Sequence, residues 1–152
     1  MLRICIDMRG EVLPGEIPQL GDFAGCGPNP ETRYDMAISS DIDIVTLTDN
    51  TGVKVGYCSF FTNEVSELVG NEVLAGYQID YVFIKEEFRG RRLSKLMAPF
   101  LAREIVLFIN SLKTRHGKAP ISFNDNSQYV STGGWKFNEY MKDCIKESEL
   151  GL

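Results

Sequence analysis

Residues 77–94 read Tyr77-Gln-Ile-Asp-Tyr-Val-Phe-Ile84-Lys-Glu-Glu-Phe88-Arg-Gly-Arg-Arg-Leu-Ser94. The first eight are mostly apolar, and such a run is typical of a central strand that is buried on both faces of a sheet. The charged triplet 85–87 ends this strand. A basic loop follows, and a long helix is predicted to begin at residue 93. A strand, a loop and a helix in this order predict a mixed α/β fold.

The long helix is predicted from its apolar residues, which recur at steps of three and four. These residues are Leu96, Met97, Phe100, Leu101, Ile105, Phe108, Ile109 and Leu112. Pro99 falls inside the helix and is expected to kink it or to disturb one turn, because proline has no amide hydrogen. After Gly117 the pattern predicts a strand over residues 119–123, a helical turn over 125–131 and a last strand over 135–141.

The first half of the chain predicts a strand over residues 2–8 and a hairpin with strands at 44–48 and 53–61. The segment Asp49-Asn-Thr-Gly52 has the composition of the connecting turn. Residues 9–40 are rich in turn formers and contain one short helix, predicted over 31–38 after Pro30. Together these elements predict a single α/β (α+β) domain over residues 1–152, with a mixed, mostly antiparallel central sheet and helices on its faces.

Composition excludes several classes of protein. The 152 residues carry 16 basic and 21 acidic side chains, a net charge of −5, which argues against a nucleic-acid-binding face. No apolar run is long enough for a membrane span, and the chain is expected to be soluble and cytoplasmic. Four widely spaced cysteines, Cys5, Cys26, Cys58 and Cys144, match no zinc or redox motif and are expected to be reduced thiols. No metal site is predicted.

The basic loop is the main functional signal. Arg89, Arg91, Arg92 and Lys95 place four cations within seven residues of an acidic protein. The first amides of a helix lack intrahelical acceptors, so a loop that enters a helix is a natural site for an anion such as phosphate. Gly90 allows a tight turn there. The alternative is a solvated basic helix start without a ligand. Neither a P-loop nor a Gly-x-Gly-x-x-Gly motif occurs.

These residues resemble the GCN5-related N-acetyltransferase superfamily, whose signature is Val-x-Pro-x-Tyr-Arg-Gly-x-Gly-x-Gly/Ala. Here it reads Ile84-Lys-Glu-Glu-Phe-Arg-Gly-Arg-Arg-Leu-Ser94, and the order of elements agrees over roughly residues 43–141. Arg92 and Ser94 replace two glycines of the family motif, and Glu86 replaces its proline. The later segment Tyr129-Val-Ser-Thr-Gly-Gly-Trp135 resembles a second family motif, with one extra residue.

The resemblance implies acetyl-CoA as cosubstrate, with the pantetheine arm along the end of the central strand and the pyrophosphate at the basic loop. The implied coenzyme A contacts are Val82, Phe83, Ile84, Arg89, Gly90, Arg91, Arg92, Leu93, Ser94 and Asn124, with Asn126 as the alternative to Asn124. It also implies Tyr129 as the acid for the leaving thiolate and Asp80 as the general base. Asp80 is expected to share a strand face with Val82 and Ile84. A structural hydrogen-bond acceptor at Asp80 and a packed aromatic at Tyr129 are the alternatives.

The resulting hypothesis is an acetyl-CoA-dependent N-acetyltransferase that acts on a primary amine of a small molecule or on a protein lysine. A non-catalytic module that binds acyl-CoA or another protein is the first rival, and a binder of a different phosphate ligand is the second. No membrane or nucleic-acid partner is expected. The oligomeric state stays open, with a homodimer among the alternatives.

Overall fold

The computed structural model describes residues 2–14, 17–64, 72–127 and 132–150. These residues form one five-stranded sheet, three α-helices and two short 3-10 turns, η1 and η2. The elements in chain order are β1 Arg3–Asp7, α1 Pro28–Ser39, β2 Asp43–Thr48, β3 Lys54–Glu64, β4 Val73–Ile84, η1 Glu86–Phe88, η2 Leu93–Leu96, α2 Ala98–His116, β5 Ile121–Asp125 and α3 Thr132–Leu150. No helix among the described residues has the length and apolar character needed to cross a bilayer.

The sheet is mixed, as predicted, and its strands follow the chain order β1-β2-β3-β4-β5. The neighbours β2, β3 and β4 are antiparallel, whereas β1 is parallel to β2 and β5 is parallel to β4. Two of the four pairings are therefore antiparallel. The two parallel pairings are those whose connections contain α1 and α2, because parallel neighbours need a crossover of this kind.

The predicted hairpin between β2 and β3 is confirmed. Its turn is closed by the Asp49 carboxylate, which accepts hydrogen bonds from the amides of Thr51 at 2.9 Å and Val53 at 3.0 Å. Gly52 has a φ of 86°, a value that glycine adopts at little cost. The turn residues thus fix the register in which the two strands pair.

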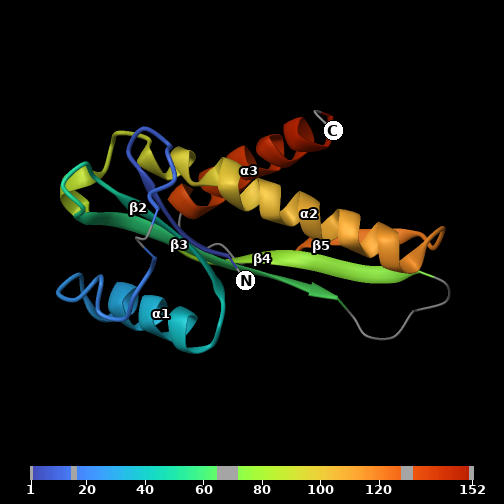
Figure 1. Cartoon of the computed structure of the whole chain (residues 1–152), viewed down its shortest axis with the longest axis horizontal. Helices are drawn as coiled ribbons and strands as arrows, with labels where there is room; N and C mark the ends of the chain where they lie inside the picture. The colour runs from blue at the N-terminus through green and yellow to red at the C-terminus, as the bar shows by residue number, and fades with distance from the viewer. Residues whose placement is uncertain (1, 15–16, 65–71, 128–131, 151–152) are drawn as a thin grey trace.

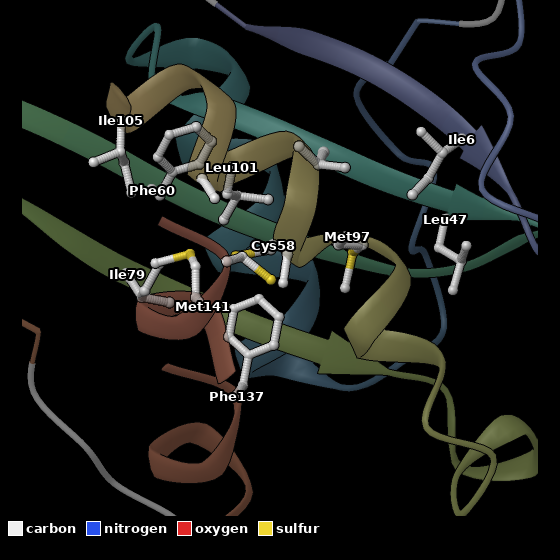
Figure 2. Packing of buried hydrophobic residues seen from close by; sticks show 14 of the residues in the cluster. Ile6, Leu47, Cys58, Phe60, Ile79, Met97, Leu101, Ile105, Phe137 and Met141 are labelled. Carbon is white, nitrogen blue, oxygen red and sulfur yellow. The ribbon is translucent and has the colours of Figure 1, made fainter. Parts of the chain in front are cut away.

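Helices lie on both faces of the sheet: α1 covers one face, and α2 and α3 lie together on the other (Figure 1). The main core fills the space between the sheet and the pair α2 and α3. In it, Leu101 of α2 and Met141 of α3 lie against Cys58 and Phe60 of β3, and all four are fully buried (Figure 2). A smaller aromatic cluster around Tyr57 lies on the α1 face.

The helix starts differ from the predictions in one respect. The helix expected over residues 31–38 is confirmed and extends over Pro28–Ser39. The long helix begins at Ala98 rather than at residue 93, and Leu93–Leu96 form a separate 3-10 turn. Pro99 therefore lies in the first turn of α2, where no amide hydrogen is needed, and it does not kink the helix.

The last predicted strand, over residues 135–141, is wrong, because this segment belongs to helix α3. Phe137, Met141 and Cys144 follow one another at steps of four and three, and all three are buried against α2 and the sheet. That spacing is helical. The prediction ended at residue 141, before Cys144 could reveal the period.

Candidate ligand-binding site at the edge of strand β4

The site begins with an irregularity in β4. In the antiparallel pairing with β3, Tyr81 lies opposite Ser59, but Ile79 lies opposite Phe60, the next residue of β3. Asp80 is therefore an extra residue, and β4 has a β-bulge at this position. A bulge bends its strand and breaks the alternation of side chains between the two faces.

The bulge decides which side chains of β4 face which helices. Val82 and Ile84 pack with the main core on the α2 and α3 face, whereas Tyr81 and Phe83 pack with the aromatic cluster on the α1 face. The Asp80 carboxylate is held on the α1 face as well, by contacts described below. The prediction that Asp80 shares a face with Val82 and Ile84 is therefore wrong, because it assumed unbroken alternation.

Among the described residues, one edge of β4 has no neighbouring strand beyond Tyr77, although the Ile79 amide donates a hydrogen bond to Ser127 Oγ at 2.9 Å. β5 pairs with β4 only over Val73–Tyr77. Farther along, the Lys85 amide donates a hydrogen bond to the Val55 carbonyl of β3 at 2.9 Å. Successive residues of a strand direct their backbone groups to opposite edges, so the backbone groups of Ile84 point away from β3. The Ile84 carbonyl accepts a hydrogen bond there from Arg89 Nε at 2.8 Å. By alternation, the backbone groups of Val82 also point outward, toward a ligand that lies along this edge.

A cavity of about 750 Å³ lies beside this edge, and we call it the edge cavity. Its lining comes from β4, from the basic loop that follows β4 in the sequence, and from the distant helix α3. The lining residues are Tyr81–Ile84, Phe88–Gly90, Arg92–Lys95, Lys136, Phe137 and Tyr140. They include eight of the ten predicted coenzyme A contacts.

The edge cavity is cationic. Arg89, Arg92, Lys95 and Lys136 line it, and no carboxylate is among its lining residues. Within the described part of the chain, none of these four cations forms an ion pair with a carboxylate. Four uncompensated positive charges in a protein of net charge −5 favour an anionic ligand.

Aromatic rings hold two of these cations in place. The Arg89 guanidinium lies 5.7 Å from the centre of the Phe83 ring, and Lys95 Nζ lies 4.8 Å from the centre of the Tyr140 ring. Both distances are typical of cation–π contacts. Arg91, a predicted coenzyme A contact, lies instead over Phe88, is exposed and is not part of the lining.

Leu93 and Ser94 open the 3-10 turn η2 at the cavity, so their amides have no acceptor within the turn. The prediction that a long helix begins here is wrong, because α2 begins only at Ala98. A turn of four residues has a small dipole, since few peptide units are aligned. Positive potential at the cavity therefore comes mainly from side chains.

Arg92 has left-handed backbone angles, with φ 57° and ψ 30°. In the family motif this position is a glycine, the first of the two that this chain lacks. The backbone thus keeps a conformation that favours glycine although arginine occupies it, at a cost of about 1 kcal/mol.

This strain predicts a difference between two variants that both remove the guanidinium. We expect Arg92→Gly to be about 1 kcal/mol more stable than Arg92→Ala, because only glycine relieves the left-handed strain. Urea denaturation measures this difference, and equal stabilities would contradict it. Calorimetry with coenzyme A extends the comparison: the glycine variant keeps its affinity if backbone amides hold the phosphates, and both variants lose it if the side chain does.

Asp80, the predicted base, lies next to the edge cavity and outside its lining. Its carboxylate accepts a hydrogen bond from Ser59 Oγ at 3.2 Å and lies 3.6 Å from a guanidinium nitrogen of Arg33 on α1. Burial and, to a lesser extent, the charge of Asp80 raise the pKa of the Cys58 thiol. Cys58 is therefore an unreactive core residue. The contacts with Ser59 and Arg33 give Asp80 a structural role in addition to any role in a reaction.

The other predicted residues are placed as follows. Asn124 is exposed on β5, where its amide nitrogen lies 3.4 Å from Ser122 Oγ, and it does not line the edge cavity. Tyr129 lies outside the described residues. Asn126, the alternative to Asn124, donates its backbone amide to the Tyr77 carbonyl at 2.8 Å, at the point where β5 leaves β4.

Helix α3 supplies lining residues that were missed from the sequence: Lys136, Phe137 and Tyr140. They were missed because their segment was read as a strand, although the helical spacing of Phe137, Met141 and Cys144 was the available signal. Electrostatic repulsion by Cys144 is the main cause that raises the pKa of Tyr140. The Tyr140 phenol therefore stays protonated and can donate a hydrogen bond.

A buried polar residue fixes α3 against the sheet next to the cavity. Asn138 is fully buried, and its carbonyl oxygen accepts a hydrogen bond from the Tyr77 hydroxyl at 3.1 Å. Its amide nitrogen donates to Asp125, whose carboxylate also lies 3.5 Å from Lys142 Nζ. These bonds join α3 to β4 and β5 where the two strands separate.

Comparison with family models, with curated proteins and with solved structures finds no match to this chain. No relative therefore contributes a ligand, a reaction or an active-site residue to the interpretation. What the site binds is inferred from its shape, its charge and the residues that line it.

Proposed function

We propose that this protein is an N-acetyltransferase of the GCN5-related type, with acetyl-CoA as cosubstrate and a primary amine as acceptor. One observation carries the proposal: within the described ranges, the edge cavity combines an edge of β4 that lacks a neighbouring strand with four cations that form no ion pair. Its volume of about 750 Å³ is within the range of small-molecule sites. The ligand that suits it has an anionic part and a long arm of amide and apolar groups.

Coenzyme A has both parts. The cations of the loop and of α3 suit its phosphates, because charge-assisted hydrogen bonds to phosphate oxygens are strong. The outward backbone groups of Val82 and the amide of Ile84 suit the amides of its pantetheine arm, which would bind as a neighbouring strand does. Apolar side chains such as Leu93 and Phe137 complete the wall. These properties of the lining support coenzyme A as the proposed ligand.

The proposed reaction requires a neutral amine, yet an amine with a pKa near 10.4 is protonated at pH 7, a cost of roughly 4 to 5 kcal/mol. Asp80 is the proposed base that accepts this proton. The amine nitrogen then attacks the thioester carbonyl carbon, a C–N bond forms and the C–S bond breaks. A tyrosine hydroxyl protonates the leaving sulfur, with Tyr129 and Tyr140 as the candidates. The acylated nitrogen releases its second proton to the resulting tyrosinate, so the products are the amide, the free thiol and a proton held by Asp80.

A non-catalytic module that binds acyl-CoA is the second candidate. Two observations favour it: Arg92 and Ser94 occupy positions where the family motif has glycine, and Asp80 is engaged by both Ser59 and Arg33. Either function requires coenzyme A to bind. Binding and turnover are therefore tested separately.

Binding is tested by thermal denaturation with coenzyme A, with ATP and with inorganic pyrophosphate. A ligand present at about 100 times its Kd stabilises the native state by about 2.7 kcal/mol, so a clear rise in Tm is expected with coenzyme A. ATP and pyrophosphate should act more weakly, because they lack the pantetheine arm. An equal shift with ATP would favour a different phosphate ligand, and no shift with millimolar coenzyme A would reject the proposal.

Turnover is tested by the release of free thiol from acetyl-CoA in the presence of amines. We expect Asp80→Asn to lower kcat by about a hundredfold or more with the affinity for coenzyme A unchanged, because it removes the base and keeps the side-chain shape. Comparing Tyr129→Phe with Tyr140→Phe identifies the acid, since only one should slow the reaction. A wild-type protein that binds coenzyme A and acetylates no amine would support the non-catalytic module.

A further inference from the structure

We infer that the acceptor is a small zwitterion, an α-amino acid or a close analogue, with its ammonium group on Asp80 and its carboxylate on Arg33. This inference rests on the proposed function and names the acceptor class, which that function leaves open. The ion pair between Arg33 and Asp80 carries it. The pair joins helix α1 to the bulge of β4 at the open edge of the sheet.

The ion pair is loose. Its nitrogen–oxygen distance is 3.6 Å, longer than the 2.7 to 2.9 Å that is typical of a charge-assisted hydrogen bond. The Arg33 side chain is 53% exposed, whereas that of Asp80 is only 18% exposed. Asp80 is also held by Ser59. The carboxylate is thus fixed, and the guanidinium, on a long exposed side chain, is free to move away from it.

The pair also lies beside a residue that lines the edge cavity. Asp80 is followed directly by Tyr81, which lines the edge cavity although its ring packs with the α1-face aromatic cluster. β5 pairs with β4 only as far as Tyr77, and beyond it the Ile79 amide donates a hydrogen bond to Ser127 Oγ at 2.9 Å. Among the described residues, the edge of β4 has no neighbouring strand from Tyr81 onward. An acceptor bound at Asp80 on the α1 face therefore reaches the cavity across the open edge.

Charge balance then selects the acceptor. A simple amine that binds Asp80 as an ammonium ion displaces Arg33 and leaves the guanidinium without a carboxylate. A lysine within a protein does the same, since it has no carboxylate near its amine. An α-amino acid supplies both charges, so one ion pair is exchanged for two and no charge is left unpaired. The planar guanidinium suits a carboxylate through two parallel hydrogen bonds.

The experiment compares amino acids with the amines that they give on decarboxylation: phenylalanine with phenethylamine, tyrosine with tyramine, histidine with histamine, and lysine with cadaverine. The measured quantity is the ratio of kcat/KM for each amino acid to kcat/KM for its amine. We expect a ratio of at least about ten for the preferred pair, because a charged hydrogen-bonding partner distinguishes the two substrates.

Arg33→Gln should lower this ratio by about tenfold or more, and Arg33→Lys should restore part of it, because lysine keeps the charge without the planar fork. The control is Arg103→Gln, which makes the same change at an exposed arginine of α2 on the opposite face and should keep the wild-type ratio. Melting curves for each variant show that it folds. A ratio near or below one for every pair, or a ratio unchanged in Arg33→Gln, would overturn the inference.

Calorimetry with the same ligand pairs, on the protein saturated with coenzyme A and on the protein alone, provides a readout that does not need turnover. Tighter binding of amino acids than of amines, lost in Arg33→Gln, supports the inference even if no acetyl transfer occurs. Absence of coenzyme A binding rejects the proposed function, and the amino-acid titration of the protein alone still decides the role of Arg33. Equal binding of amines and amino acids rejects the inference and leaves the proposed function standing.

Discussion

The double variant Lys95→Glu/Lys136→Glu is expected to bind coenzyme A at least about a hundredfold more weakly than the wild-type protein. The two lysines line the edge cavity from different segments, the basic loop and helix α3, and neither forms an ion pair with a carboxylate among the described residues. A charge-assisted hydrogen bond contributes about 1.5 to 3 kcal/mol. Losing two of them and adding repulsion corresponds to two or more orders of magnitude in Kd.

Calorimetry at low salt measures this loss, and two comparisons isolate its cause. The control Lys113→Glu/Lys118→Glu makes the same change in net charge at two exposed lysines outside the cavity lining, so it should bind coenzyme A almost normally. Pantetheine, which lacks phosphates, should bind the Lys95→Glu/Lys136→Glu variant and the wild type equally. An equal loss of coenzyme A affinity in the control would show that only the overall charge matters, and the phosphates would then not lie in the edge cavity.

Leu101→Ala is expected to lower the free energy of unfolding by about 3 to 5 kcal/mol, a large part of the total for a domain of this size. Leu101 is fully buried in the main core between α2 and the sheet, and alanine there leaves a cavity that the neighbouring side chains fill only partly (Figure 2). The Tm should fall by roughly 10 °C.

The matched control is Leu107→Ala, the same substitution in the same helix at a side chain that is 51% exposed. It should change the stability by no more than about 0.5 kcal/mol. Urea denaturation of both variants measures the contrast. Similar costs at the two positions would mean that α2 does not pack on the sheet through the face that carries Leu101, and the placement of the basic loop above β4 would then be wrong as well.

Periodicity made the larger elements predictable. The apolar steps of three and four specified helix α2, and the turn residues 49–52 specified the hairpin, because both signals come from neighbours within a few positions. Local signals failed where the pattern was short or interrupted. The segment 135–141 resembles a strand because its helical period becomes visible only with Cys144. Pro99 lies at the start of α2, whereas the apolar pattern predicts a helix that already includes it and is kinked there.

The basic loop and the end of β4 were recognisable as a candidate site from the sequence alone. Arg89 and Arg92 belong to a cation cluster that indicated an anion, whereas Val82, Ile84 and Ser94 were implied as contacts by the family resemblance. The structure brings all five to one cavity. Asn124 was assigned by resemblance to a family motif and Arg91 as part of the same cation cluster, and the structure leaves both outside the lining.

The sequence by itself determined the chemistry of this site: a cluster of cations, an apolar strand and one strand carboxylate. Only the tertiary structure decided which residues meet. Lys136 and Tyr140 reach the edge cavity because α3 packs beside α2, a contact between segments that no local pattern encodes. The bulge at Asp80 depends on how β4 pairs with β3, and this pairing turns the carboxylate toward Arg33 and away from the face of Val82.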